Sequence, residues 1–246
     1  MRLEGKTAIV TGGASGFGAG IARKFAAEGA RVMVADLNIA LARGVAEEIG
    51  GIACHVDVSN DASVAAMAGS VPEDFGVPDI LVNNAGITHL PAAMEEVSEE
   101  DFDRVWAVNC KSVYLTARHL VPAMKQAGKG AILNVASTAG ISPRPKLNWY
   151  NVSKGWMITA TKTMAVELAP EGIRVNAICP VAGETPLLAS FMGEDTPEMR
   201  AKFLSTIPLG RFSTPEDMGN AACFLCSDEA AMVTGVAMEV DGGRCI

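Results

Sequence analysis

Tyr150 and Lys154 have the residue types and the spacing of an acid/base pair. They lie four residues apart where a helix is expected, so the phenol and the ammonium group should share one helical face. A lysine cation beside a phenol favours the phenolate and lowers the pKa of the tyrosine from its ordinary value of about 10. We therefore expect Tyr150 to give and take a proton near neutral pH. Many helices contain this spacing by chance, so other residues must support the pair.

Ser137 and Asn109 provide that support. Ser137 follows an expected strand and precedes Tyr150 by thirteen residues, so a short loop can bring its hydroxyl beside the phenol. There it can hydrogen-bond a substrate oxygen on which charge develops. Asn109 lies inside an expected helix, where a buried asparagine usually has a bonding task. We expect it to hold a water that connects Lys154 to solvent.

A glycine-rich segment, 11–18, lies between the first expected strand and the first expected helix. Glycines let the backbone turn sharply and approach a pyrophosphate, whose charge the helix N-terminus then meets. The spacing is G-x-x-x-G-x-G rather than the more common G-x-G-x-x-G. The residues expected to contact a dinucleotide here are Gly12, Ser15, Gly16, Phe17 and Gly18.

Asp36 ends the second expected strand, twenty residues after Gly16. A carboxylate there can accept hydrogen bonds from ribose hydroxyls and repels the additional phosphate of NADP. Neither Ser15 nor its neighbour Leu37 supplies a cation for that phosphate, so NAD is the expected cofactor. The alternative is that Asp36 only caps the following helix.

Two later strand ends should reach the same edge of the sheet. Asp57 and Val58 follow the third expected strand, and Asn84, Ala85 and Gly86 follow the fourth. Ligands bind at the carboxyl ends of the strands in open parallel sheets, so we expect contacts to adenine and the adjoining ribose. The alternative for Asn84, Ala85 and Gly86 is that they form only a turn.

Short β-branched segments alternate with amphipathic helical segments along the whole chain. This alternation predicts an α/β fold over 1–246, a single-domain, doubly wound parallel sheet of Rossmann type with about seven strands and helices on both faces. The expected strands are 7–10, 31–35, 52–56, 80–82, 131–135, 174–178 and 236–240, and the expected helices lie near 17–28, 38–49, 61–70, 99–127, 149–169 and 215–226.

The segment 185–210 interrupts the alternation and is rich in apolar side chains and proline. An insertion of this length is more often a mobile lid over a substrate site than a plain connection, and a surface helical hairpin is the alternative.

Composition excludes several classes of protein. A formal net charge of −8 argues against a nucleic-acid partner, which requires a basic face. No apolar stretch is long enough for a signal peptide or a membrane span, so we expect no membrane partner. The six cysteines show no disulfide framework, which predicts reduced thiols and a cytoplasmic protein. Cys223 and Cys226 form a C-x-x-C that we interpret as helix packing rather than a redox pair or half a zinc site, and no metal is expected.

Taken in order and with their spacing, these motifs resemble the short-chain dehydrogenase/reductase family over essentially the whole chain. The resemblance implies Tyr150 as acid/base, Ser137 as orienter of the carbonyl, Lys154 as partner of the tyrosine and ligand of the nicotinamide ribose, and Asn109 in a proton relay. It also implies a homotetramer built on the two long helices and the C-terminal region.

The segment after the sixth expected strand departs from the family pattern, which usually reads Pro-Gly followed by Thr. The resemblance implies that Pro180, Gly183 and Thr185 contact the nicotinamide, but Val181 stands where the glycine is usual. The backbone path there is therefore an open question.

The expected function is NAD-dependent interconversion of an alcohol, secondary and possibly aromatic or a sugar, and its carbonyl. The segment 180–186 and the C-terminus are similar to those of family members that act on 4-formylbenzenesulfonate or glucose. The alternatives are a 3-oxoacyl-carrier-protein reductase and a non-catalytic NAD(H)-binding sensor.

The loop between Ser137 and Tyr150 carries two cations, Arg144 and Lys146, in an acidic protein. Either they bind an anionic substrate, with Trp149 as a flat wall for its ring, or they are solvated residues or subunit contacts.

Overall fold

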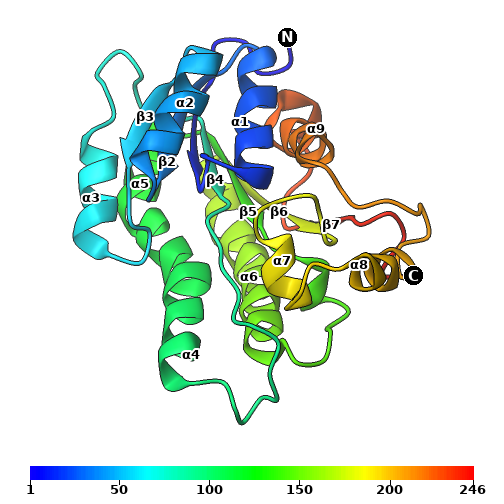
Figure 1. The fold of residues 1–246 in the computed structure, drawn as a ribbon. Coiled ribbons are helices and arrows are strands. Elements are labelled where there is room, and N and C mark those ends of the chain that lie inside the picture. Colours follow the sequence, from blue (N-terminus) through cyan, green and yellow to red (C-terminus); the bar gives the residue numbers. More distant parts are fainter.

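Seven strands pair in parallel in the order β3-β2-β1-β4-β5-β6-β7, in a computed structural model that describes all of residues 1–246 (Figure 1). The expected α/β fold with helices on both faces is confirmed. The strands are β1 (Thr7–Thr11), β2 (Arg31–Asp36), β3 (Ile52–His55), β4 (Ile80–Asn83), β5 (Gly130–Val135), β6 (Ile173–Pro180) and β7 (Ala237–Val240).

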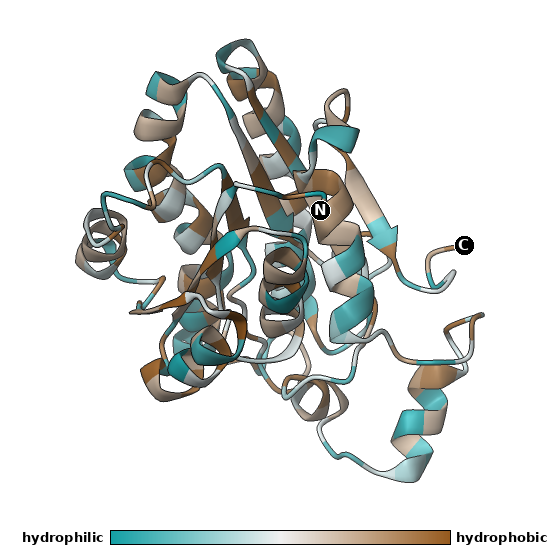
Figure 2. Cartoon of the chain, turned by 90° about the horizontal axis from the view of Figure 1, so that it is seen from above, coloured by the Kyte–Doolittle hydropathy of each residue, from teal (hydrophilic) through white to brown (hydrophobic).

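Successive strand residues point to opposite faces of the sheet, and both faces are buried. In β1, Ala8 and Val10 join one apolar cluster, whereas Ile9 joins the other. Figure 2 shows mostly hydrophobic strands at the centre and helices of mixed hydropathy around them. The first face is covered by α1 (Gly16–Ala27), α2 (Ile39–Ile49) and α9 (Pro215–Cys226), and the second by α3 (Asp61–Gly69), α5 (Ser112–Ala127) and α6 (Asn148–Leu168).

The long helix expected over 99–127 is present in three parts. It begins as α4 (Glu99–Trp106), passes through a π-helical turn over Ala107–Lys111 and continues as α5. Ser98 caps its start by accepting a hydrogen bond from the Asp101 amide, and three acidic residues in the first turn favour the helix dipole. A π-helical turn inside an α-helix is frequently found at functional sites, and Asn109 lies in this one.

A buried polar network connects the sheet to the two long helices of the second face. Asn83 of β4 donates a hydrogen bond to Asn134 of β5 (2.9 Å). Thr116 of α5 donates to Asn83 (2.8 Å), and Asn134 donates to Thr161 of α6 (2.9 Å). Each of these side chains is buried and partnered, as a polar group inside an apolar core requires. The network fixes α5 and α6 against the same two strand ends.

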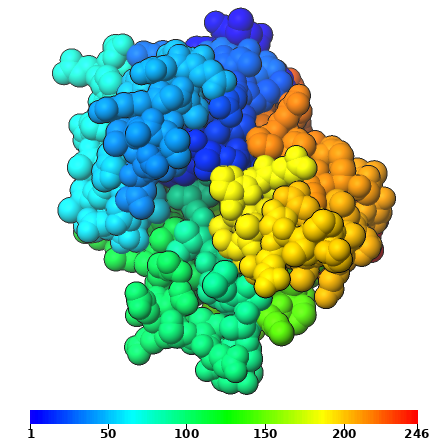
Figure 3. All heavy atoms as spheres, viewed as in Figure 1, coloured from blue at the N-terminus to red at the C-terminus, as the bar shows by residue number.

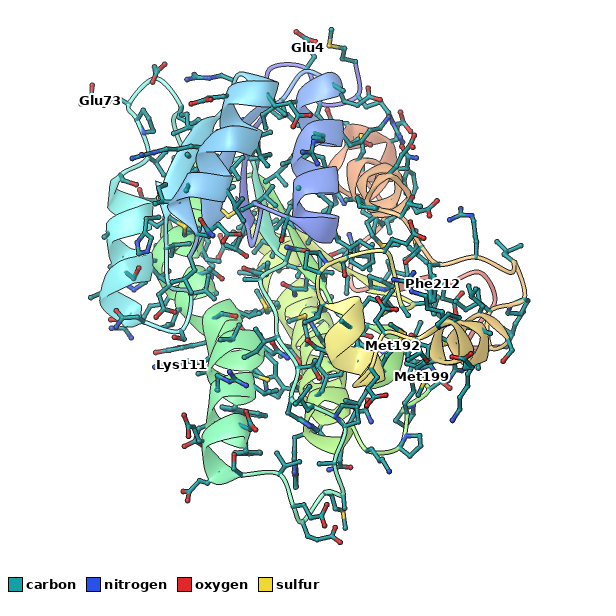
Figure 4. The ribbon with its side chains drawn as sticks, in the orientation of Figure 1. Glu4, Glu73, Lys111, Met192, Met199 and Phe212 are labelled. Carbon is teal, nitrogen blue, oxygen red and sulfur yellow. The ribbon has the colours of Figure 1, made fainter.

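We call the insertion over 185–210 the lid segment. It contains two short helices, α7 (Leu188–Met192) and α8 (Pro197–Leu204). It has its own apolar cluster, separate from the two sheet clusters. Figure 4 shows Met192, Met199 and Phe212 gathered around these helices. The segment borders the cleft described below, as expected of a lid over a substrate site rather than of a hairpin confined to the surface.

Four of the six cysteines are buried, and Cys54 and Cys245 are partly exposed. All six are free, and Cys223 and Cys226 pack on the first sheet face from α9. Burial raises the pKa of Cys226 to about 12, so it stays a thiol at neutral pH. No helix combines the length and the apolar character needed to cross a bilayer.

Candidate active site

A cleft of about 450 Å³ opens at the carboxyl ends of the strands, where β1 and β4 lie side by side and the chain turns in opposite directions from them. Figure 3 shows the yellow lid segment reaching the blue N-terminal half on this side of the molecule. Of the predicted site residues, only Gly18 and Asn109 do not line the cleft. Those that do are Gly12, Ser15, Gly16, Phe17, Asp36, Leu37, Asp57, Val58, Asn84, Ala85, Gly86, Ser137, Tyr150, Lys154, Pro180, Gly183 and Thr185.

The glycine-rich turn needs its glycines for two reasons. Gly12 and Gly16 have positive φ angles of 60° and 51°, a region that favours glycine. Gly18 is required for packing, because a Cβ there would lie 2.1 Å from the Gly12 carbonyl oxygen. Gly18 therefore shapes the turn, and its contact with a cofactor stays a prediction.

Asn84 braces this turn from β4. Its side-chain amide donates hydrogen bonds to the carbonyl oxygens of Thr11 and Gly12 (2.9 Å each). The Thr11 hydroxyl accepts a hydrogen bond from the backbone N–H of Asn84 (3.1 Å) and donates one to the Val82 carbonyl (3.2 Å). Both side chains thus hold the end of β1 to the end of β4, a role of Thr11 that its place in the glycine-rich segment did not reveal.

Asp36 extends its carboxylate toward the turn. One oxygen accepts from the Ala14 amide (3.1 Å) and the other from the Asn38 amide (2.9 Å). The residue that caps α2 is Asn38, whose side chain accepts from the Leu41 amide, so the capping interpretation of Asp36 is wrong. The carboxylate lines the cleft beside exposed Leu37, and no lysine or arginine lines this end.

Ser137, Tyr150 and Lys154 meet at the opposite end of the cleft. The Ser137 hydroxyl accepts a hydrogen bond from the Ala139 amide (3.1 Å), which fixes its direction. Tyr150 is 5% exposed, and the Lys154 ammonium lies 5.9 Å from the centre of its ring. Lys154 donates to the Val135 carbonyl at the end of β5 (2.8 Å). The spacing of four residues therefore places both side chains on the face of α6 that lines the cleft, as predicted.

The pKa values differ from the expectation. Burial raises the pKa of Tyr150 to about 12, although the nearby Ser137 hydroxyl lowers it. Burial also lowers the pKa of Lys154 to about 8. Desolvation disfavours both charged forms and outweighs the attraction on which the sequence argument relied. Tyr150 in the chain alone is therefore a protonated phenol at neutral pH, ready to act as an acid.

Asn109 lies behind the cleft and is completely buried. Its side-chain amide makes a two-way pair with the Ile87 backbone (2.9 Å each) and donates to the Ser153 hydroxyl (3.0 Å), which donates to the Tyr150 carbonyl (2.7 Å). A Cβ on Gly86 would lie 3.3 Å from the Lys154 ammonium and 3.4 Å from the Asn109 side-chain oxygen. The expected bonding task is present and holds the turn after β4 against the start of α6.

The β6 end explains the departure at Val181. Its backbone continues the sheet by donating to the Val240 carbonyl (3.4 Å), and neither Val181 nor Gly183 has a positive φ. The Val181 side chain packs into the lid cluster. Glycine is instead required at Gly183, where a Cβ would lie 2.3 Å from the Phe17 ring. Pro180, Gly183 and Thr185 therefore still line the cleft.

Some cleft residues were not predicted from the sequence, and the lid segment supplies the largest side chains among them. Leu187, Phe191 and Phe203 line the cleft, and the Phe191 ring lies 5.0 Å from the Tyr150 ring, centre to centre. Arg144 lines it too, as the anion-binding interpretation of the loop requires, whereas Lys146 fits the alternative of a solvated residue and Trp149 forms no wall of the cleft. Lys146 is exposed outside the cleft, and Trp149 packs edge-on against Phe102.

Comparisons with known proteins agree with this geometry. The sequence model of a family described as enoyl-(acyl carrier protein) reductase matches residues 12–244. The chain is 50% identical to a 4-formylbenzenesulfonate dehydrogenase of Comamonas testosteroni and 41% identical to a 3-oxoacyl-[acyl-carrier-protein] reductase of Thermotoga maritima, each over 100% of both chains. A crystal structure of a 3-ketoacyl-(acyl-carrier-protein) reductase from Brucella melitensis complexed with NADH superposes with a TM-score of 0.94 at 50% identity, over 99% of this chain and all of that one.

Lys154 should reduce the stability of the fold below pH 8. Its folded pKa of about 8 lies below the ordinary lysine value of 10.5, which we take for the unfolded chain. The unfolded chain therefore binds more protons between these values, and the stability contributed by this group rises with pH there. Lys154→Met should therefore raise the unfolding temperature at pH 7 by roughly 2–8 °C, and less at pH 9.5. Scanning fluorimetry at both pH values measures this. Exposed Lys162→Met on the same helix is the control, and a less stable Lys154→Met protein at pH 7 would contradict the prediction.

Proposed function

The chain belongs to the short-chain dehydrogenase/reductase family and is an oxidoreductase, and we propose that it interconverts an alcohol and its carbonyl by hydride transfer with NAD. The observation that carries the proposal is the convergence of Ser137, Tyr150 and Lys154 on the cleft that the glycine-rich turn also lines. A non-catalytic NAD(H)-binding sensor would be expected to lack at least one of these three side chains. All three line this cleft, which favours an enzyme.

The cleft has the features that NAD requires. The turn with positive φ angles and the N-terminus of α1 suit a pyrophosphate, and the Asp36 carboxylate suits ribose hydroxyls. Pro180, Gly183 and Thr185 would border the nicotinamide, and Asp57, Val58 and Ala85 the adenosine half. A nicotinamide bound there would supply the hydride chemistry, as acceptor in oxidation of the alcohol and as donor in reduction of the carbonyl.

The protein supplies the accompanying proton transfer. In reduction, the Tyr150 hydroxyl gives its proton to the carbonyl oxygen as the hydride reaches the carbon, and in oxidation the phenolate takes the alcohol proton back. The Ser137 hydroxyl donates to the same substrate oxygen and stabilises the charge that develops there. The Lys154 ammonium stabilises the phenolate, and its pKa of about 8 keeps it charged at neutral pH.

Asn109 completes the proposed proton relay. Its amide hydrogens are used by Ile87 and Ser153, but one lone pair of its side-chain oxygen is free to accept a hydrogen bond from a water. Because this oxygen and the Lys154 ammonium both border Gly86, one water can connect them. The relay would return protons to Tyr150 from solvent.

A 3-oxoacyl-carrier-protein reductase is the second candidate, favoured by two of the similar proteins. A preference for NAD(H) set by Asp36 is compatible with this function too, since the Brucella reductase is complexed with NADH. The dehydrogenase relative acts, by its name, on an aromatic aldehyde, which favours a small aromatic substrate for this chain. Assaying NADH oxidation against aromatic aldehydes and 3-oxoacyl thioesters distinguishes the two.

We further propose a cytoplasmic homotetramer. Six free thiols support a reducing compartment. Large apolar side chains are exposed along the long helices and near the C-terminal strand, as expected of subunit contacts. They are Phe102, Trp106, Tyr114, Val152, Val166 and Met232.

Tyr150→Phe tests the function directly. Loss of the transferable proton should lower kcat by about 10²–10⁴-fold while NADH affinity stays within a factor of about three, because the ring and its packing against Phe191 remain. Initial rates and a fluorescence titration of NADH measure the two effects. Phe191→Leu is the matched control for ring packing, and comparable turnover by Tyr150→Phe would refute the role of Tyr150.

Asp36 should set the cofactor preference. NAD(H) should bind more tightly than NADP(H). Asp36→Ala should lower the ratio of the NADP(H) to the NAD(H) dissociation constant by about 10-fold or more, because it removes both the acceptor for the ribose hydroxyls and the repulsion of the phosphate. Calorimetric titration of both reduced cofactors measures it. Tighter NADPH binding by the native protein would be the contrary result.

The assembly should depend on α6. Light scattering should give about four times the 25.6 kDa chain mass at micromolar concentration. Val166→Glu, at a side chain that is 79% exposed, should produce smaller species by placing charges in an apolar contact. Leu41→Glu on α2 adds the same charge elsewhere and should leave the tetramer intact. A native monomer would overturn the proposal.

A further inference from the structure

Arg144 is a fixed cation at the substrate end of the cleft. Its guanidinium lies 4.3 Å from the centre of the Phe203 ring and donates one hydrogen bond to the Thr206 hydroxyl (3.1 Å). Its carbonyl accepts from the Asn151 side chain at the start of α6 (2.7 Å). The lid segment and α6 therefore hold the side chain and the backbone of Arg144 in one position, with donors left over.

A second cation approaches it from the C-terminal turn. Arg244 donates to the Ser142 hydroxyl (3.1 Å), and its Nε atom is buried without a hydrogen-bond partner. Asp241 forms no ion pair with Arg244, and its carboxylate accepts hydrogen bonds from the backbone amides of Gly243 and Cys245. Burial, and then repulsion by Arg244, lowers the pKa of Arg144, so the two like charges act on each other.

Neither arginine has an anionic partner in the chain. Within and just after the lid segment, Arg200 pairs with Asp195 and Arg211 with Asp217. Arg174 also lacks a carboxylate, but it donates to three backbone carbonyls. Arg144 and Arg244 each make one side-chain hydrogen bond to a neutral hydroxyl. Partly buried cations without an anion are unfavourable, and a bound anion would relieve this.

We propose that Arg144, which lines the cleft, binds a carboxylate or sulfonate group of the substrate at the end opposite the carbon that reacts beside Tyr150, and that the charge of Arg244, outside the cleft lining, strengthens this binding. The inference rests on the proposed function and deepens it. Phe191 packs on Tyr150 and Phe203 on Arg144, so the two lid rings form an apolar wall from the acid/base to the cation. The substrate class is thus an alcohol or aldehyde with an aromatic body and an anionic group across the ring. The planar guanidinium of Arg144 matches two oxygens of such a group.

The test uses a matched pair of ligands that cannot react. The enzyme saturated with NADH is titrated calorimetrically with 4-(hydroxymethyl)benzoate and with 4-(hydroxymethyl)benzamide, which differ in charge and little in shape. The acid should bind at least about 10-fold more tightly than the amide. Arg144→Met should weaken the acid by about 10- to 100-fold and the amide by less than about threefold, and Arg144→Lys should be intermediate. Arg244→Met should show the same selectivity.

Arg43→Met is the control, because Arg43 is exposed on α2, forms no ion pair and makes the same change in net charge. It should leave both affinities unchanged. Equal affinity of the native enzyme for acid and amide, no binding of either, or equal losses in Arg144→Met would each overturn the anion site. The proposed function has a separate readout, since NADH binding and the reduction of neutral aldehydes by the native enzyme do not require Arg144.

Discussion

In a parallel sheet every strand runs in the same direction, so each connection must cross a face before the next strand begins. All seven strands of this chain obey that constraint, and their carboxyl ends therefore meet at one edge. The cleft is lined by the glycine-rich turn, Asp36, Ser137 and the end of β6, each of which lies at or just after the end of a strand. The first two are about a hundred residues or more from the last two in the chain. Tyr150 and Lys154 join them because the loop after β5 is short and leads directly into α6.

Burial dominates the electrostatics of the site. The same desolvation that raises the pKa of Tyr150 lowers that of Lys154, so both groups are closer to neutral than either would be in water. A dry site strengthens any interaction with charge that develops on a substrate. Behind the site, Asn109 and Ser153 make hydrogen bonds that fix its geometry, and one lone pair of the Asn109 side-chain oxygen stays available for the water of the proposed relay.

Much of this organisation could be predicted from the sequence. Strands and helices show hydrophobic periodicities that survive folding, and residues at strand ends must share an edge once the sheet is parallel. The predictions that differ from the structure do so because they depend on contacts between distant parts of the chain. The pKa of Tyr150 depends on how deeply the chain buries it, which no local spacing encodes. Gly18 and Val181 depend on close approach by Gly12 and by the lid cluster, and Trp149 depends on a partner 47 residues earlier in the chain, Phe102. The cleft-lining role of Phe203 depends on how α8 docks.

The lid segment has an apolar cluster of its own, joined to the sheet chiefly through Val181 at the end of β6. This separation makes the protein modular in evolution. Changes among the lid side chains can reshape the pocket wall without disturbing the two clusters that hold the sheet, whereas the turn that braces β1 against β4 tolerates little change. Substitutions among the lid side chains would therefore change which alcohols are accepted without altering the residues of the hydride-transfer end, and two similar proteins, 50% and 41% identical to this chain, are named for different substrates.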